Sequence, residues 1–555
     1  MKAKHISLYI ALLAISGSAA AQKAGNKDTT IKSTTIEVIQ SYKPVVKQAP
    51  KPEFAPALPP ADTSRPAYTY TVPAQTLFFT YHSLPLKPLA LGKDTTHDPF
   101  ANYIKFGLGN LKTIYLDAGI GSLKGENFAT AIHVHHLSQS GNIDNQNSAQ
   151  TGLEAEGTLY KQKNNWHAGF EGYRNQYSWY GYNHDLVEYT KSDVQQIYYK
   201  FGAEVDMYNN QPLAWGLNYH PEVSAGVFTA NNVADGHKLS PERSINLNVP
   251  FSKDFDTSFR IQLGLVGKFA QLSVDDHSVS NNYFQVTPAA FYHKNNFSAN
   301  LGLYPTFAKN ITYLLPDIGL HYTLPSSQIG FGAGWSASLI QNTFEQLATK
   351  NPYISITDIY NNNGNTIRQT RTDELYGSAQ TNIGHHITVS ARLSWWTYRN
   401  LPMFMNNYSD EKQFSVLYEN KVNAISLQAN LRYQISNNFA VGFSGTWYNF
   451  YNSTGAHVWQ EPGVRLRADL MFRPIPKLTI TAYTYVLDHI YAVNTNNEST
   501  KLKGVFDLGG GAEYQIIPRL SVFLQINNLL NNANERWLGY TSYGFNIFGG
   551  IRFKF

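Results

Sequence analysis

Apolar and polar residues alternate along the last stretch of the chain, residues 503–555. Every second residue from Tyr543 to Phe555 is apolar or glycine, whereas the positions between them include Arg552 and Lys554. Residues 520–527 alternate in the same way. A β-strand with lipid on one face and water on the other requires this pattern, because successive side chains point to opposite faces. The pattern therefore predicts that the chain ends in hairpins of a transmembrane β-barrel with an aromatic last residue.

The same alternation recurs upstream and is interrupted by short turn signals. These are asparagine pairs or segments with glycine, proline, lysine or aspartate, near residues 124–125, 164–165, 210–212, 253–254, 295–296, 325–326, 384–385, 437–438, 474–476 and 516–518. Ten tight turns at one end of a barrel and eleven loops at the other would connect about 22 strands, with both chain ends on the turn side. The sequence thus predicts an all-β fold, a transmembrane antiparallel β-barrel of about 22 strands. This size is typical of plugged outer-membrane transporters.

The first hundred residues differ from the rest. Residues 1–21 combine a positively charged start, an apolar core and an Ala-rich cleavage site, which predicts a signal peptide removed before Gln22. Residues 22–100 hold ten prolines between Pro44 and Pro88, which predicts a Pro-rich periplasmic or lumenal extension without a packed core. The barrel is assigned to residues 101–555.

Composition narrows the function classes. The chain is 14% aromatic and 15% charged, and its mean hydropathy is negative, which fits a barrel better than a bundle of membrane-spanning helices. It has no cysteine, which excludes disulfides, thiolate metal sites and cysteine catalysis. A net charge of +5 is too small to indicate a nucleic-acid partner.

Charged side chains on the strands are assigned to the lumen, because Arg or Lys at the lipid midplane costs about 2–4 kcal/mol. The predicted lumen-lining charges are Glu154, Glu156, Glu171, Arg260, Lys268, Arg392, Arg432, Arg465 and Arg467. The glutamates and the last four arginines are expected on opposite sides of the bore. They either set up a transverse field, which would orient dipolar solutes or hold an inserted N-terminal segment, or are each hydrated or paired with a neighbour.

Specific chemistry is sparse in this sequence. His133 and His135 would share one strand face and His136 the other, and because no run of carboxylates is nearby we interpret them as polar lumen residues. We find no Gly-rich phosphate loop, nucleophile elbow or zinc-protease motif. The sequence therefore predicts no metal site, no catalytic residue, no cofactor and no enzyme activity.

One loop and several aromatic clusters stand out. Residues 342–369 form the longest stretch without strand character, and Asn342-Thr343 predicts the start of a short helix that ends before Asn351. This loop could fold inward to constrict the lumen or act as an outer lid over a ligand. Aromatic clusters such as residues 177–182 are expected in interfacial girdles or loop packing, with a sugar-stacking platform as the alternative.

The segment Asn527-Asn528-Leu529-Leu530-Asn531, followed by a last strand ending in Phe555, resembles the barrel domain of TonB-dependent receptors of the Bacteroidota type. Leu530 stands where that family usually has an aromatic residue. The residues before the barrel are too few for the family's plug domain and lack its Arg-Gly pairs. The resemblance therefore covers the barrel and not the plug.

The resemblance implies partners and a location. Ile36, Glu37, Val38 and Ile39 resemble a TonB box, a segment that pairs edge to edge with a TonB-like energy-coupling protein, although a plain extended segment would look the same. Phe553 and Phe555 resemble the signal read by the barrel-assembly machinery. The expected location is the outer membrane, in contact with its lipids, with both chain ends in the periplasm.

Two functions follow from these expectations. The first is solute passage across the outer membrane by a TonB-dependent-receptor-like barrel. The second is a structural or assembly subunit of an outer-membrane complex whose lumen is filled, because a wide barrel without a plug would otherwise leave a harmful hole. Residues 22–100, inward loops or a partner protein could fill it.

Overall fold

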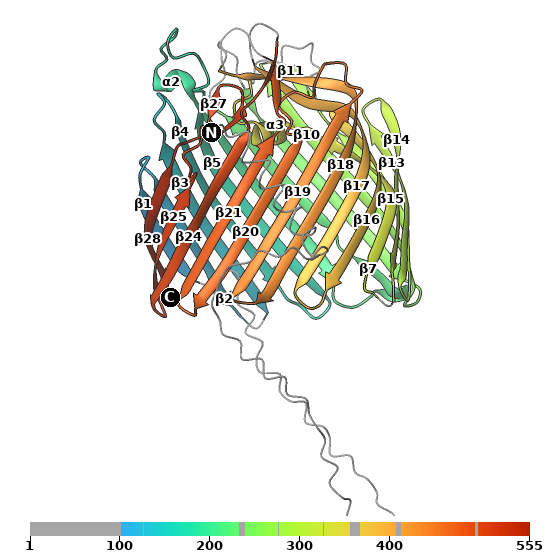
Figure 1. Ribbon diagram of the computed structural model, residues 1–555. Helices are drawn as coiled ribbons and strands as arrows, with labels where there is room; N and C mark the ends of the chain where they lie inside the picture. The colour runs from blue at the N-terminus through green and yellow to red at the C-terminus, as the bar shows by residue number, and fades with distance from the viewer. Residues whose placement is uncertain are drawn as a thin grey trace, which may run out of the picture. The chain divides into compact units, whose positions relative to one another are not determined.

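A computed structural model of the protein describes residues 102–125, 127–231, 239–275, 277–325, 327–355, 367–406, 412–493 and 498–555. Within these residues the chain forms a closed antiparallel β-barrel of 22 strands (Figure 1). The ring closes because the first strand pairs with the last, with Ile104 opposite Phe553 and Gly107 opposite Gly550. The predicted fold class and strand number are confirmed. The predictions on residues 1–100 lie outside the described residues.

The wall strands follow one another around the ring in chain order. They are β1 (Tyr103–Gly109), β2 (Ile114–Lys124), β3 (Phe128–Ser140), β4 (Asn147–Leu159), β5 (Asn164–Ser178), β6 (Gln195–Asn209), β8 (Glu222–Ala230), β9 (Leu239–Asp254), β10 (Phe259–Val274), β12 (Tyr283–Lys294), β13 (Phe297–Ala308), β14 (Ile311–Thr323), β15 (Gly330–Gln341), β16 (Gln369–Ile383), β17 (Ile387–Asn406), β18 (Phe414–Ser436), β19 (Phe439–Tyr451), β20 (Val464–Ile475), β21 (Leu478–Asp488), β24 (Val505–Ile517), β25 (Leu520–Asn527) and β28 (Asn546–Lys554).

The remaining elements belong to the connections. They are α2 (Lys191–Val194), the 3-10 helix η2 (Ala214–Gly216), β7 (Leu217–Tyr219), β11 (His277–Ser280), α3 (Phe344–Lys350), β22 (Tyr491–Val493), β23 (Ser499–Lys501), β26 (Glu535–Trp537) and β27 (Tyr540–Thr541). No helix among the described residues is long and apolar enough to cross a membrane.

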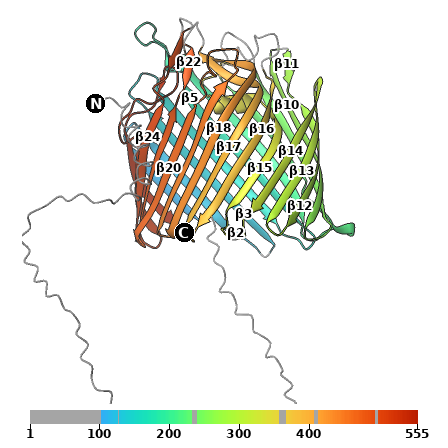
Figure 2. The same cartoon turned by 45° about the vertical axis from the view of Figure 1, so that its right-hand side comes forward.

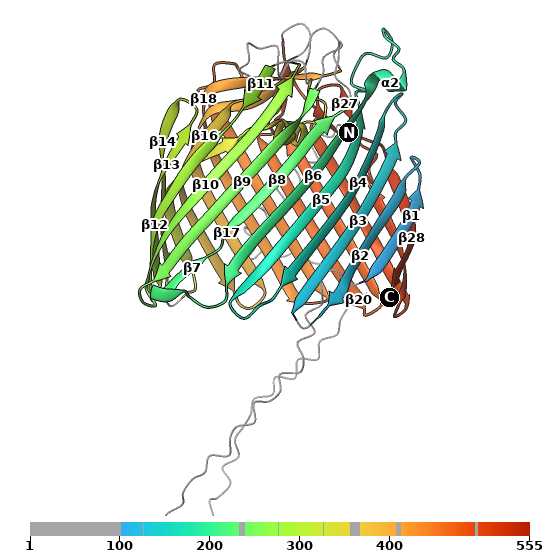
Figure 3. The ribbon, with the colours of Figure 1, turned by 180° about the vertical axis from the view of Figure 1, so that it is seen from behind.

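The two ends of the barrel differ. Each turn predicted from the sequence joins two consecutive wall strands, as Asn295-Asn296 joins β12 to β13 and Pro476-Lys477 joins β20 to β21. The opposite end carries the loops that contain α2, α3, β11, β22 and β27 (Figures 2 and 3). The C-terminus lies at the short-turn end (Figure 1). The predicted turn positions are therefore confirmed to within a few residues, although residues 164–165 and 253–254 belong to β5 and β9, and the connection between β6 and β8 holds η2 and β7.

The outer face of the wall is apolar, as the alternation predicts. Leu153 of β4, Phe201 of β6 and Leu393 of β17 are all exposed, with Phe201 55% and Leu393 56% accessible. The strand pairing places Leu153 beside Gly172 and Gly172 beside Phe201, so one outward row crosses three strands. Exposed apolar side chains in such rows match a lipid-facing belt. The charged residues between them therefore face the lumen.

The last strand follows the predicted alternation with one correction at its start. Ile551, Phe553 and Phe555 are exposed on the outer face, and Arg552 faces inward, where its Nη1 lies 3.3 Å from Glu513 Oε1. However, β28 begins only at Asn546, and the Tyr543 hydroxyl bonds the Ser148 hydroxyl at 2.9 Å instead of facing lipid. The final loop draws Tyr543 into the mouth of the barrel, which the alternation of its neighbours does not reveal.

Candidate functional site in the barrel lumen

Inward-facing carboxylates of β4, β5 and β6 form an acidic wall. Glu154 and Glu171 stand directly opposite each other in the strand pairing. Together with Glu156 and Glu204 they border a cavity of about 600 Å³, which Lys268 also lines. Glu154, Glu156, Glu171 and Lys268, which the sequence analysis assigns to the lumen, all line this cavity. Sequence reading missed Glu204, although it follows the same alternation on β6.

Three histidines contact carboxylates of this wall, namely His167 of β5, His220 between β7 and β8, and His133 of β3. His167 Nδ1 lies 2.7 Å from Asp206 Oδ2, and His220 Nε2 lies 2.9 Å from Asp206 Oδ1. His133 lies between two carboxylates, 3.2 Å from Asp117 and 3.6 Å from Glu154. The sequence interpretation of His133 as a polar residue without nearby carboxylates is corrected here. Antiparallel pairing brings His133 next to Asp117, 16 positions earlier in the chain, and next to Glu154, 21 positions later.

Three of the predicted lumenal arginines are paired locally. Arg260 Nε lies 2.6 Å from Asp254 Oδ1, and Arg392 donates to both carboxylate oxygens of Glu374 at 2.8 and 2.5 Å. Arg465 pairs with Glu461. These contacts support the interpretation that the charges are compensated by their neighbours, rather than that all of them contribute to one transverse field.

The other two arginines have no ion pair among the described residues. Arg432 bonds the side chain of Gln434 at 3.4 Å, and Arg467 stands opposite Ser444 in the strand pairing. A residual field across the bore can therefore come from Arg432 and Arg467, facing the acidic wall of β4 and β5. The wall strands β18 and β20 lie twelve and fourteen positions around the ring from β4.

The loop between β15 and β16 contains the predicted helix and holds it against the wall. The Thr343 hydroxyl accepts a hydrogen bond from the Gln346 N–H at 3.2 Å, so α3 begins where the sequence predicts. The first N–H groups of a helix have no partner within the helix. Here those of Phe344 and Glu345 donate to the Glu242 carboxylate of β9 at 2.7 and 3.0 Å. The wall strand thus supplies part of the helix cap, together with Thr343.

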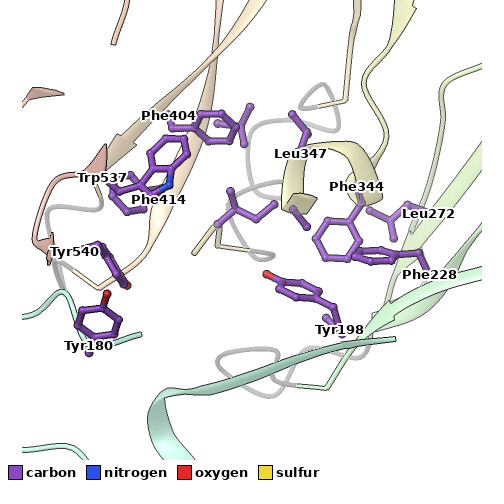
Figure 4. Close-up of a cluster of buried hydrophobic side chains, with 14 residues drawn as sticks. Tyr180, Tyr198, Phe228, Leu272, Phe344, Leu347, Phe404, Phe414, Trp537 and Tyr540 are labelled. Carbon is purple, nitrogen blue, oxygen red and sulfur yellow. The ribbon is translucent and has the colours of Figure 1, made fainter. Parts of the chain in front are cut away.

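An aromatic and aliphatic cluster around α3 crosses the bore (Figure 4). Phe344 of α3 is fully buried and makes edge contacts with Tyr198 of β6 and Phe228 of β8. From the opposite side the cluster includes residues of β17, β18 and the final loop, namely Phe404, Phe414, Val416, Trp537 and Tyr540. Residues 343–355 of this loop therefore fold inward and narrow the lumen at the long-loop end, one of the loop's two predicted roles.

The segment after α3 extends the same cluster. Tyr353 stacks on Tyr540 of the final loop with ring centroids 3.6 Å apart, and the Tyr198 hydroxyl bonds the Pro352 carbonyl at 2.9 Å. Ile354 is fully buried. The apolar side chains of this segment, among them Phe344, Leu347 and Ile354, therefore have the packing of a protein core rather than of a surface loop.

Ion pairs fix the two ends of α3 to different parts of the barrel. Lys200 Nζ of β6 lies 2.7 Å from Glu345, and Lys350 Nζ lies 3.0 Å from Glu461 in the β19–β20 loop. Burial raises the pKa of Glu461, but the charges of Lys350, Arg465 and Arg536 outweigh this effect and lower its pKa to about 2. Glu461 is therefore ionised at any physiological pH, and the contact with Lys350 is a charged one.

The aromatic cluster at residues 177–182 belongs to loop packing and not to a girdle. Trp179, Tyr180 and Tyr182 are buried among residues of the loops. In contrast, Trp395 and Trp447 are about half exposed on the outer face, where lipid-facing aromatics are expected. The sequence analysis expected either interfacial girdles or loop packing. Residues 177–182 show loop packing, whereas Trp395 and Trp447 lie where a girdle is expected.

The barrel is similar in structure to outer-membrane receptors and transporters. The FrpB iron transporter from Neisseria meningitidis matches with a TM-score of 0.63 and 10% identity, over 83% of this chain and 82% of that one. The ferripyoverdine receptor of the outer membrane of Pseudomonas aeruginosa matches with a TM-score of 0.59 and 12% identity, over 82% and 72%. The copper transporter OprC matches with a TM-score of 0.61 and 11% identity, over 82% and 81%. The chain has the fold of these proteins. Its sequence matches no protein-family model and no curated protein.

Phe553 and Phe555 stand on the outer face at the short-turn end, with ring centroids 6.3 Å apart. The TonB-box-like residues Ile36, Glu37, Val38 and Ile39 lie outside the described residues. At 10–12% identity the comparisons support the fold, and the chemistry of this lumen has to be argued from its own residues.

Proposed function

We propose that the protein passes a solute across the outer membrane through the lumen of its barrel. The observation that carries this proposal is the closed 22-strand wall with an apolar outer face and a charged lumen that contains a cavity of about 600 Å³. A cavity of this size falls in the range of small-molecule sites. The structural neighbours named as an iron transporter and a copper transporter support the same class of function.

The acidic wall favours a cationic solute. Glu154, Glu156, Glu171 and Glu204 border the cavity, with Lys200 and Lys268 as its lysines. A lumen lined by an excess of one charge raises the local concentration of the opposite charge. We infer that cations and cationic complexes enter more readily than anions.

The inward-folded loop obstructs passage from the long-loop end. The cluster around Phe344 spans the bore, so a solute larger than an ion has to displace α3 or pass beside it. TonB-like coupling through residues 36–39 is one source of energy for this movement. Val38→Pro should then abolish energy-dependent uptake, because proline removes an N–H from an edge-pairing strand. Uptake that is insensitive to this change and to the proton gradient would leave passive flow.

We propose a plugless receptor-like barrel of the Bacteroidota type, exported by the signal peptide of residues 1–21 and inserted by the barrel-assembly machinery. In this proposal the short-turn end and both chain ends face the periplasm, and residues 22–100 form the Pro-rich extension. The wall contacts outer-membrane lipids.

A structural or assembly role is the second candidate, and the cluster around α3 favours it. A bore crossed by fully buried side chains such as Phe344 and Leu347 is suited to a closed barrel that acts as a scaffold. In that case the lumen carries little traffic, and the outer loops bind a partner protein.

Planar-bilayer conductance separates the two functions. The mature protein, a version lacking residues 22–100 and the variant Phe344→Ala would be compared at equal insertion levels. Solute passage predicts cation-selective currents that increase in at least one of the two altered versions. A scaffold predicts a closed barrel in all three, and that result would overturn the passage proposal.

A further inference from the structure

Two histidines and a glutamate meet on the lumenal face of β3 and β4. Ligand atoms of His133, His135 and Glu154 all lie within 4.8 Å of one another. Among the described residues, no other group of three or more His, Cys, Asp or Glu side chains brings its ligand atoms this close together. His133 and His135 are two residues apart on β3 and so point to the same face, and Glu154 is the strand-pairing partner of His133.

Asp117 of β2 orients the His133 ring. The Asp117 carboxylate lies 3.2 Å from His133 Nε2, so the neutral imidazole carries its proton on this nitrogen and donates it to Asp117. The lone pair of Nδ1 then points to the other side, where Glu154 Oε2 lies 3.6 Å away. A carboxylate that fixes the tautomer of a metal-binding histidine is a recurrent second partner in metal sites.

The spacing of these two atoms suits a bridging metal ion. Zinc binds imidazole nitrogen and carboxylate oxygen at about 2.0–2.2 Å, so a tetrahedral ion holds the pair about 3.3 Å apart. The observed 3.6 Å between His133 Nδ1 and Glu154 Oε2 is near this value and is long for a direct hydrogen bond. The Glu154 side chain is 59% exposed, so it can adjust its position.

The backbone opposite His135 leaves room for its ring. Gly152 is the strand-pairing partner of His135, and a Cβ atom at this position would lie 2.1 Å from His135 Cε1. Only glycine permits this close approach. The His135 ring therefore lies over the β4 backbone next to Glu154, with its centroid 5.6 Å from that of His133.

The charges around Glu154 leave it available for a cation. Like charges directly opposite each other on neighbouring strands are destabilising. Glu171, opposite Glu154, is compensated by Lys200 at 2.5 Å. Glu154 itself contacts only His133 among the described charged residues, and both line the 600 Å³ cavity.

We propose that His133, His135 and Glu154 bind a divalent transition-metal ion of the zinc or nickel class in the lumen, with Asp117 as the positioning residue. Two imidazoles and a carboxylate are ligands that these ions prefer, and water would complete the coordination. Since the site faces the cavity, the ion can exchange with the lumen. This inference does not depend on solute passage, because it concerns binding to the folded barrel whether or not the barrel conducts.

Zinc titration of the purified mature protein without a histidine tag tests the proposal. Isothermal calorimetry should give one high-affinity zinc ion per barrel. His133→Ala, His135→Ala and Glu154→Gln should each lower the affinity at least tenfold, and Asp117→Asn should lower it about 10- to 100-fold. The matched control is His321→Ala, because His321 is also a lumenal histidine but lines a different cavity. Its affinity should equal that of the unchanged protein.

Heat-modifiable mobility on a gel verifies that each variant is folded. For the unchanged protein, a second measurement follows modification of histidines by diethyl pyrocarbonate, read by mass spectrometry. Zinc should protect His133 and His135 and leave His321 as reactive as before. The proposal is overturned if the unchanged protein binds no zinc, if the ligand variants bind it within twofold of normal, or if zinc protects none of these histidines or protects all three equally.

Discussion

Phe344→Ala tests whether the loop around α3 closes the bore by packing. Phe344 is fully buried and contacts Tyr198 and Phe228, with ring centroids 6.2 and 5.1 Å from its own. Truncating a buried phenylalanine to alanine costs about 3–5 kcal/mol, because it removes apolar contacts and leaves a cavity. The wall strands pair independently of α3, so we expect this cost to fall mainly on docking of the loop.

The lost packing energy sets how far the balance between docked and undocked loop shifts. At 1.4 kcal/mol for each factor of ten, a loss of about 3–5 kcal/mol raises the ratio of undocked to docked loop by about two to nearly four orders of magnitude. Hydrogen exchange of the α3 amides reports this ratio directly, because the Leu347 N–H donates to the Thr343 carbonyl at 3.0 Å only when the helix is formed. The protection of the α3 amides against hydrogen exchange should fall by this factor, or to that of an unprotected amide if the helix has less protection to lose.

A matched control isolates the effect of the loop. Phe255→Ala makes the same chemical change at an exposed aromatic in the turn between β9 and β10, at the other end of the barrel. It should leave exchange at α3 unchanged. If Phe344→Ala gives a folded, heat-modifiable barrel with unaltered protection at α3, then packing of this residue does not hold the loop and our reasoning fails.

Four further predictions follow from the lumen and the last strand. The pKa of Glu461 lies at about 2, below its ordinary value of 4.5. Its stabilisation of the docked loop is therefore fully present above pH 4.5 and is lost as the pH falls through about 2. Hydrogen exchange at α3, corrected for the intrinsic effect of pH on exchange, should show this loss. Arg392→Met leaves the buried Glu374 carboxylate without its cation and should lower the free energy of unfolding in urea by about 3–5 kcal/mol, whereas adding Glu374→Gln should recover part of the loss. Deleting Phe555 should reduce the heat-modifiable barrel in outer membranes more than any single loop substitution, and normal levels would contradict its role as an assembly signal. Arg467→Gln should increase cation selectivity in a salt gradient, with an effect that fades at high salt, and an unchanged reversal potential would remove any role for its field.

The wall was predictable from sequence because one rule governs all of it. A strand between lipid and water must alternate, and a tight turn must use residues such as Asn295-Asn296 or Pro476-Lys477 that favour turns. Both signals are local, so counting them gave the number of strands. The capped start of α3 at Thr343 was predictable for the same reason.

The lumenal chemistry was not predictable because it depends on register. Asp117, His133 and Glu154 become neighbours only when β2, β3 and β4 pair with one particular alignment. A shift by one residue would turn each side chain to the other face. The place where Tyr543 leaves the wall likewise depends on its contact with Ser148, a residue 395 positions earlier in the chain.

Lys200 connects the acidic wall to the loop that closes the bore. Its ammonium group lies 2.5 Å from Glu171 on the wall and 2.7 Å from Glu345 on α3. One lysine therefore compensates two carboxylates, and a cation that binds Glu171 competes with Lys200 for this carboxylate and leaves Lys200 to Glu345. Glu154 of the proposed metal site stands directly opposite Glu171. A cation bound at that site would therefore lie next to the ion pairs by which Lys200 joins Glu171 to Glu345 of the docked loop.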